Sequence, residues 1–454
     1  ALKKDRDASS AYAGLGEAFF QRKLYRDAVT QFKRAIEIKP SNDNYKISLA
    51  RAYQSLNQFK DAEKYFQLAF STNSKNPRSF YFYGLFLEEK KEATRAISIY
   101  RKALELDGDF YNARLSLGKL FAKEGQLEDA IAEYKLAIKY DKKNPALHLT
   151  LGKLLLNSSD SSKAIFHLNK AVKLMPQDFQ ARIKVAEMMM EKGMLDESLD
   201  SYQKVAVMQP NNANIYSRLG KIYSKKGNQD KAIEAYKKAI EIDPENAENQ
   251  YQLGKFFVQV KQFENAKKAL DKALSLRNSH NPTHYELGRV LYAESKFVEA
   301  EEAFAKAVTG DVGNITYTLA FADTQVKNKK YNDALDILLK LSKNVSNNVD
   351  LIFAICNVYS KKRYYTVAIG HCEEAVKINP NEVDAMNRLA WLYAKKRTNV
   401  DQGIELIKTV IEKHPNSAKY IDTFSELLYV NGDIAKAIEN IQEAIKLDSE
   451  NSYY

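Results

Sequence analysis

Apolar residues recur along the chain with the spacing of amphipathic helices, and a two-helix pattern repeats every 34 residues. The stretch from Ala213 to Asn246, ANIYSRLGKIYSKKGNQDKAIEAYKKAIEIDPEN, shows it most clearly. Only 17 Gly and 9 Pro interrupt a 454-residue chain dominated by Ala, Leu, Lys, Glu and Ile. We therefore expect long helices joined by short turns, with little sheet, in an array whose core grows with its length.

Seven positions of the repeat, numbered 7, 8, 11, 20, 24, 27 and 32, keep a residue type from copy to copy. In the stretch above they are Leu219, Gly220, Tyr223, Ala232, Tyr236, Ala239 and Pro244. Steps of 34 residues recover Leu15, Gly16, Ala28, Phe32, Ala35 and Pro40 in the first copy, and Leu117, Gly118, Ala130, Tyr134 and Ala137 in the fourth.

The physical reason for this pattern is the packing of two antiparallel helices. Small residues at positions 8, 20 and 27 let the helices approach closely, while large residues at 7, 11 and 24 fill the space between turns. The Pro at position 32 ends the second helix. Each pair leaves one apolar face uncovered, which the next pair covers, so stability becomes a sum of neighbour contacts.

The pattern resembles the tetratricopeptide repeat (TPR) family. The resemblance implies an all-α, right-handed superhelical α-solenoid of tetratricopeptide helix pairs. Thirteen repeats are expected at 9–42, 43–76, 77–110, 111–144, 145–178, 179–212, 213–246, 247–280, 281–314, 315–348, 349–382, 383–417 and 418–451. The twelfth carries one extra residue in the turn between Lys395 and Gln402, with Gly403 at a small-residue position, which predicts a local distortion there.

Both ends of the chain are in phase with further copies. Residues 1–8 match the end of a preceding TPR helix, and residues 452–454 match the start of a further repeat. Because solenoids ordinarily carry polar capping helices, we expect a segment of a longer, bacterial TPR protein. Self-association through uncapped ends, or a protein that truly ends here, are the alternatives.

In the TPR family, positions 2, 5, 9, 12 and 13 of each first helix line the concave groove. Position 5 is mostly apolar and position 9 is basic in six repeats. The candidate protein-binding groove therefore comprises Tyr81, Leu115, Lys119, Leu149, Lys153, Ile183, Lys221, Tyr251, Lys255, Tyr285, Arg289 and Tyr292, with the single tryptophan, Trp391, as a candidate hot spot.

An apolar floor with a basic rail fits partner segments that have apolar side chains and acidic flanks. The alternative is that the apolar residues pack between neighbouring helices and that the lysines are solvated filler. The chaperone-tail carboxylate clamp and the asparagine ladder of sugar transferases, two known TPR binding modes, both lack their required residues here.

The net charge of +11 is spread thinly along the chain, and Lys outnumbers Arg more than threefold, which argues against nucleic acid as a partner. The sequence contains no run of about 20 apolar residues, so we expect no transmembrane segment. Secretion stays open because a signal peptide could have been removed. The compartment stays unknown, with cytoplasm and periplasm both open.

No motif of nucleophilic, nucleotide or zinc chemistry occurs, so we expect no enzyme, no cofactor and no metal. His280 and His284 have helix-face spacing for a metal, but no third ligand is evident, and we expect a surface pair. Cys356 and Cys372 fall at core positions 8 and 24 of one repeat. Two unbonded, buried side chains are the default, and a disulfide between the two helices is the alternative.

The long uninterrupted array favours a non-catalytic protein–protein interaction scaffold in a large assembly. A peptide-motif receptor or adaptor using the concave groove, and a regulatory TPR arm of an enzyme, are the alternatives. The segments NRLAWLYA from Asn387 and YIDTFSELLYVNGD from Tyr420 are similar to repeat pairs of bacterial TPR proteins, including those of the cell envelope and motility apparatus.

Overall fold

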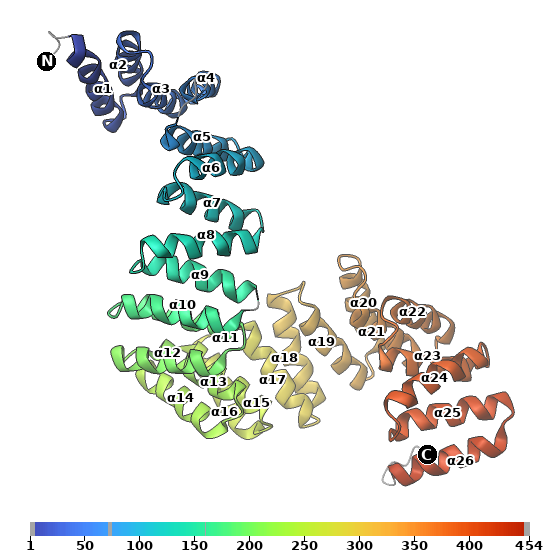
Figure 1. Ribbon diagram of the computed structural model, residues 1–454. Coiled ribbons are helices and arrows are strands. Elements are labelled where there is room, and N and C mark those ends of the chain that lie inside the picture. Colours follow the sequence, from blue (N-terminus) through green and yellow to red (C-terminus); the bar gives the residue numbers. More distant parts are fainter. Residues whose placement is uncertain (1–4, 71–74, 159, 449–454) are drawn as a thin grey trace. The chain divides into compact units, whose positions relative to one another are not determined.

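A computed structural model describes residues 5–70, 75–158 and 160–448 of the chain, and these residues form α-helices without strands (Figure 1). Their contacts divide the chain into two compact units, residues 1–210 and 211–454. The first unit contains α1 (Asp5–Gln21), α2 (Tyr25–Ile38), α3 (Asp43–Ser55), α4 (Phe59–Phe70), α5 (Pro77–Glu89), α6 (Ala93–Leu106), α7 (Tyr111–Lys123), α8 (Leu127–Tyr140), α9 (Pro145–Asn157), α10 (Ser161–Leu174), α11 (Phe179–Glu191) and α12 (Leu195–Met208).

The second unit repeats the same succession of helix pairs. It contains α13 (Ala213–Lys225), α14 (Gln229–Ile242), α15 (Ala247–Gln259), α16 (Phe263–Leu276), α17 (Asn281–Ala293), α18 (Phe297–Gly310), α19 (Ile315–Lys327), α20 (Tyr331–Ser342), α21 (Val349–Lys361), α22 (Tyr365–Ile378), α23 (Val383–Lys396), α24 (Val400–Lys413), α25 (Ala418–Asn431) and α26 (Ile434–Leu447). The all-α solenoid expected from the sequence is confirmed. The exact residue at which each repeat begins stays a prediction.

Within a pair the two helices pack where the small residues lie. Ala232 and Ala239 of α14 are fully buried, and Tyr236 between them is almost so. Gly220 of α13 lies against that tyrosine so closely that a Cβ atom at this position would be 2.7 Å from the ring. Position 8 therefore requires a minimal side chain because a large ring at position 24 fills the space.

Successive pairs are joined in two ways in each unit. The second helix of one pair packs on the first helix of the next, as α18 does on α19 and α22 on α23. First helices of successive pairs also contact one another, as α15 and α17 or α23 and α25 do. The first helices therefore share one face, which is where the sequence places the binding groove.

The turn of the predicted twelfth repeat departs from its neighbours, as its extra residue predicts. Arg397 and Asn399 both adopt the left-handed conformation there, with φ of 52° and 49°. Such a conformation is unfavourable for residues with a Cβ atom, so the surrounding packing must hold it. Gly403 is buried in the first turn of the following helix, where a Cβ atom would be 2.8 Å from Leu427.

The register of the first residues differs from the expectation. Helix α1 runs without interruption from Asp5, so residues 5–8 belong to this helix and not to the end of a preceding one. The reason is that no Pro, Gly or Asn separates them from Ser9, whereas turn-forming residues precede other first helices. Residues 1–4 and 452–454, which the sequence assigned to flanking repeats, lie outside the described residues.

Candidate protein-binding face

The first helices of the first unit present the expected basic residues to solvent. Lys119 on α7 and Lys153 on α9 are both exposed. The apolar candidates of the same unit are half-buried and lie on four successive first helices. They are Tyr81, Leu115, Leu149 and Ile183.

In the second unit, Lys221 on α13 lies within a cluster of like charges. Its pKa is lowered by partial burial and by the nearby Arg218, Lys225 and Lys255, with only Glu248 acting in the opposite direction. Each of these cations disfavours the charged form of the Lys221 side chain. An acidic group bound here would relieve that repulsion, so the cluster is the part of the basic rail best suited to a partner.

The positive charge of Arg289 is less available to a binding partner than its place on the basic rail suggests. Its Nη1 donates a hydrogen bond of 2.8 Å to Oε2 of Glu286, a side chain that is almost fully buried. Burial raises the pKa of Glu286, while Arg289 and Lys255 lower it. The guanidinium of Arg289 is therefore largely committed to holding this carboxylate.

The aromatic candidates of the second unit connect successive repeats. Tyr251 is buried with its ring centroid 4.9 Å from that of His280, and Tyr285 lies at the same distance from Tyr317. The hydroxyl of Tyr292 donates a 2.5 Å hydrogen bond to Asp323. Packing between neighbouring repeats, the alternative that the sequence left open, accounts for these three side chains.

Trp391 is half-buried beside the irregular turn. The guanidinium carbon of Arg388 lies 5.3 Å and the Nζ atom of Lys395 lies 5.1 Å from its ring, and Tyr365 meets it edge-on at 6.0 Å. Two cations on one indole indicate favourable cation–π contacts, and Lys395 also forms an ion pair with Glu426.

Sequence reasoning missed Arg388 itself. This arginine occupies position 6 of its repeat, where several other copies hold Gly, Ser or Thr, and it lines a cavity between α19, α21 and α23. A long charged side chain at a position that is otherwise small was the available signal. Arg51 of the first unit, a basic residue at position 9 of the second repeat, lies between the rings of Phe20 and Phe82 at 4.9 and 4.6 Å.

The expected surface pair of histidines is wrong. His284 is buried and hydrogen-bonded to the carbonyl oxygen of Asn278, because it packs under the turn that precedes α17. His280 shares a 2.6 Å hydrogen bond with Thr283 and lies 3.7 Å from the Glu248 carboxylate. Among the described residues, no group of three metal-binding side chains is brought together.

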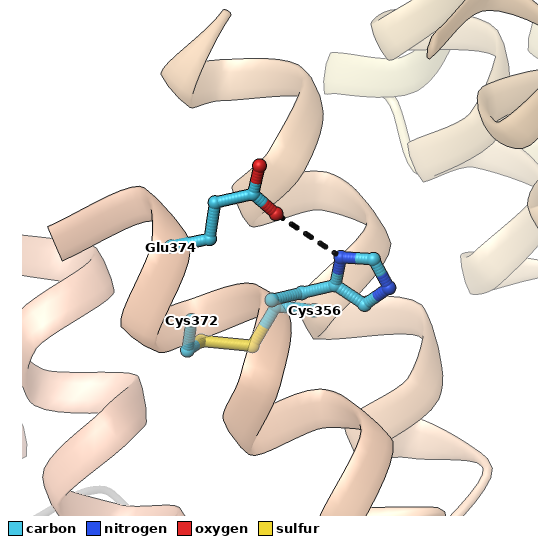
Figure 2. The surroundings of a disulfide bond; sticks show 4 residues. Cys356, Cys372 and Glu374 are labelled. Carbon is cyan, nitrogen blue, oxygen red and sulfur yellow. Dashed lines mark ion pairs between the residues drawn. A yellow bond between two sulfur atoms is a disulfide. The ribbon is translucent and has the colours of Figure 1, made fainter. Parts of the chain in front are cut away.

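Cys356 of α21 and Cys372 of α22 form a disulfide, so the default expectation of two unbonded thiols is wrong (Figure 2). Both side chains are fully buried, as expected, with Cα atoms 5.5 Å apart. Beside the bond, Glu374 extends toward the His371 ring, whose Nδ1 atom is 3.9 Å from its carboxylate, as the dashed line in Figure 2 marks. The pair joins the two helices of one repeat.

A stack of antiparallel helix pairs, whose first helices share one charged face, defines an α-helical repeat protein. Models of the tetratricopeptide repeat match residues 1–43, 213–246, 247–280 and 384–417, and a TPR repeat model matches 118–159 and 186–227. A model of YpiA-like C-terminal tetratricopeptide repeats matches 44–109. The chain belongs to the tetratricopeptide repeat family.

Among curated proteins, the chain is 32% identical over 111 residues to the type IV pilus assembly protein PilF of Pseudomonas aeruginosa. That match covers 24% of the chain and 43% of the relative, so the chain spans less than half of this relative's length.

Two solved structures resemble nearly the whole chain. The APC/C hetero-tetramer Cut9-Hcn1 is similar at 13% identity and a TM-score of 0.45, covering 99% of this chain and 95% of that one. Yeast Tom70 is similar at 17% identity and a TM-score of 0.40, covering 99% and 98%. Within the part of the chain that the structure describes, no helix is both long and apolar enough to cross a membrane.

Proposed function

We propose that the protein is a non-catalytic scaffold that binds partner proteins in a large assembly through the shared face of its first helices. The observation that carries this proposal is the cation cluster around Lys221, whose pKa is lowered by burial and by the nearby Arg218, Lys225 and Lys255. A partner segment with acidic flanks would complement the cluster and gain association rate and specificity from it.

The decisive experiment reverses two charges of the cluster. Affinity purification of the Lys221→Glu/Lys255→Glu variant from native cells, followed by mass spectrometry, should lose partners that the wild type retains. The matched control is Lys237→Glu/Lys272→Glu, which makes the same charge change at exposed positions on the second helices α14 and α16. Equal partner recovery from the two variants would end the proposal.

The bacterial cell envelope or motility apparatus is the proposed setting. The partial similarity to a pilus assembly protein supports it. So does the disulfide, because such bonds persist in oxidising compartments such as the periplasm and are rare in the cytosol. Protein isolated from its native cells under thiol-blocking, non-reducing conditions should show the Cys356–Cys372 bond by mass spectrometry, and two blocked thiols would place the protein in a reducing compartment.

Self-association is proposed as a second mode of contact, favoured by the exposed apolar stripe of α26. Ile434, Ile438 and Ile445 of this helix are 55%, 51% and 41% exposed. The variant Ile438→Glu/Ile445→Glu should sediment as a smaller species than the wild type at high concentration, and identical sedimentation would remove the proposal.

A further inference from the structure

The second unit contains a cavity of about 520 Å³ on the shared face of its first helices α19, α21 and α23. Its apolar wall includes the half-buried side chains of Leu319, Val326 and Phe353, above the buried Leu338 and Val358. The cavity is open to solvent and is large enough for more than one side chain of a bound peptide.

Charge is unequally distributed around this cavity. Four cationic residues line it, and two carboxylates oppose them. One of the two, Asp323, already accepts the hydroxyl hydrogen of Tyr292 at 2.5 Å. The other, Asp350, lies in the first turn of α21, where the helix dipole favours its negative charge. The cavity therefore carries an excess of positive charge that its own residues do not balance.

Arg388 is the cation that lies deepest. Its pKa is lowered by burial, and Asp384 is the one acidic group that opposes this shift. Asp384 is itself engaged, because its Oδ1 atom lies 2.6 Å from Nζ of Lys419. Within the described residues Arg388 makes no ion pair, and its guanidinium lies over the ring of Trp391 in a cation–π arrangement.

The side-chain amide of Asn357 is a second polar group of the cavity with an unpaired atom. Its Oδ1 atom is buried and accepts no hydrogen bond from the described residues, although it lines the same cavity. A buried acceptor without a donor costs about 1–3 kcal/mol. The backbone N–H of an extended peptide is a donor of suitable size for such a site.

We propose that this cavity binds a segment of a partner protein through an aspartate or glutamate side chain that pairs with Arg388, while an adjacent large apolar side chain of the segment packs on Phe353. The guanidinium fork matches a carboxylate in two parallel hydrogen bonds. Lys327 and Lys361 at the rim attract the approaching acidic segment, since both are exposed. The site uses none of the residues of the Lys221 cluster, so the two binding sites can be tested independently.

The test uses a displayed library of short peptides selected on the complete protein. We expect the wild type to enrich peptides in which Asp or Glu adjoins Leu, Phe or another large apolar residue. Enriched peptides are then synthesised with amidated C-termini, which removes the terminal carboxylate as a source of binding. Selection of peptides without an acidic residue, or of none at all, overturns the proposal.

Three protein variants locate the binding of these peptides by fluorescence anisotropy. Arg388→Glu should weaken it about 10- to 100-fold, the loss expected for a charge-assisted hydrogen-bonded pair. Lys396→Glu, which makes the same charge change at an exposed site on the same helix, should leave affinity within about twofold. Lys221→Glu/Lys255→Glu should also bind normally, and a loss of binding in this variant instead of Arg388→Glu would assign the peptides to the other surface.

Fluorescence emission of the single tryptophan provides a second readout, and a misfolded variant would not reproduce its titration. Because Trp391 contacts the Arg388 guanidinium, a carboxylate that pairs with Arg388 should change the tryptophan emission, with the same midpoint as the anisotropy titration. A peptide in which Gln replaces the acidic residue should lose both signals. Unchanged emission during saturable binding would contradict the assigned position.

Discussion

Gly220 shows how a single position sets the distance between the two helices of a repeat. The neighbouring ring of Tyr236 is buried and cannot move away, so a Cβ atom at 2.7 Å must displace one of the helices. Gly370 in α22 is the opposite case, because a Cβ atom there meets no atom within 4 Å. Two glycines in helix interiors thus have different reasons to be present.

Substitution by alanine should change the free energy of unfolding in opposite directions at these two glycines. Gly220→Ala should lower the free energy of unfolding by about 1 kcal/mol, since the cost of overpacking exceeds the gain in helix propensity. Gly370→Ala should raise it by about 0.5–1 kcal/mol, since only the propensity term remains. Urea denaturation of both variants measures the difference. Stabilisation by Gly220→Ala would show that the ring is not confined as described.

His148 and His167 form a pair whose hydrogen bond depends on protonation. Their Nδ1 atoms are 2.9 Å apart, so one ring must donate a hydrogen and the other must accept it. Burial, His148 and Lys135 all lower the pKa of His167. The unfolded chain therefore binds the proton at higher pH than the folded chain does.

Stability should consequently decrease as the pH falls below the ordinary histidine pKa of 6.5, and the loss should continue until the lowered pKa of folded His167 is passed. The difference in urea midpoint between about pH 7.5 and pH 5.5 measures this dependence. His167→Asn should reduce the difference, because the group that titrates is gone. A variant with the full pH dependence of the wild type would assign the effect to other groups.

The helix pair α21–α22 replaces a packing contact by a covalent bond. In other repeats a glycine at position 8 meets a large side chain at position 24, as Gly288 meets Phe304 and Gly254 meets Leu270. Here two residues of intermediate size occupy these positions, Cys356 and Cys372, and their disulfide closes a loop with a sequence separation of 16. A bond of this kind stabilises mainly by restricting the unfolded chain.

Reduction of this disulfide should cost about 3 kcal/mol of unfolding free energy for the transition that includes α21 and α22. Urea denaturation with and without a reducing agent measures it. The double variant Cys356→Ala/Cys372→Ala provides the control, because its transition should not respond to the reducing agent. If wild type and variant respond equally, the bond contributes nothing to stability.

The elements themselves could be predicted from the sequence because the repeat encodes them redundantly. A helix pair follows from small residues such as Gly220 and Ala232 at fixed spacing, and the same pattern recurs along the chain. The disulfide could only be left open, since spacing brings Cys356 and Cys372 near each other without deciding their chemistry. That residues 5–8 belong to α1 could not be predicted, because the 34-residue pattern alone assigns them to a preceding helix.

The candidate sites were harder to predict than the fold. Position in the repeat predicts which side chains line the inner face, yet it does not reveal which charges are already paired. Arg289 is held by Glu286, whereas Arg388 has no carboxylate partner among the described residues. Glu286 lies three residues before Arg289 on the same helix, whereas the acidic residue near Arg388, Asp384, pairs with Lys419 of the next repeat. The pattern of a single repeat does not reveal that second pairing.

Across the complete chain, stability is expected to come from contacts between neighbouring helix pairs, so a cut between pairs should be tolerated. The fragments 1–210 and 211–454 correspond to the two compact units. Each should fold alone, and the circular dichroism of the two fragments should add up to that of the intact chain. Loss of helicity in either fragment would show that its pairs depend on the other unit.

A cut within a helix pair provides the matched comparison. A cut at Gly227 separates α13 from α14, although it lies only 17 residues after the cut that follows residue 210. The buried Tyr236 and Ala239 then lose the helix that covers them, which should cost several kcal/mol by analogy with deletions from a packed core. We therefore expect lower helicity and a lower melting temperature for the fragment that starts at α14 than for the one that starts at α13. Equal melting temperatures would mean that the helix pair is not the unit from which this array draws its stability.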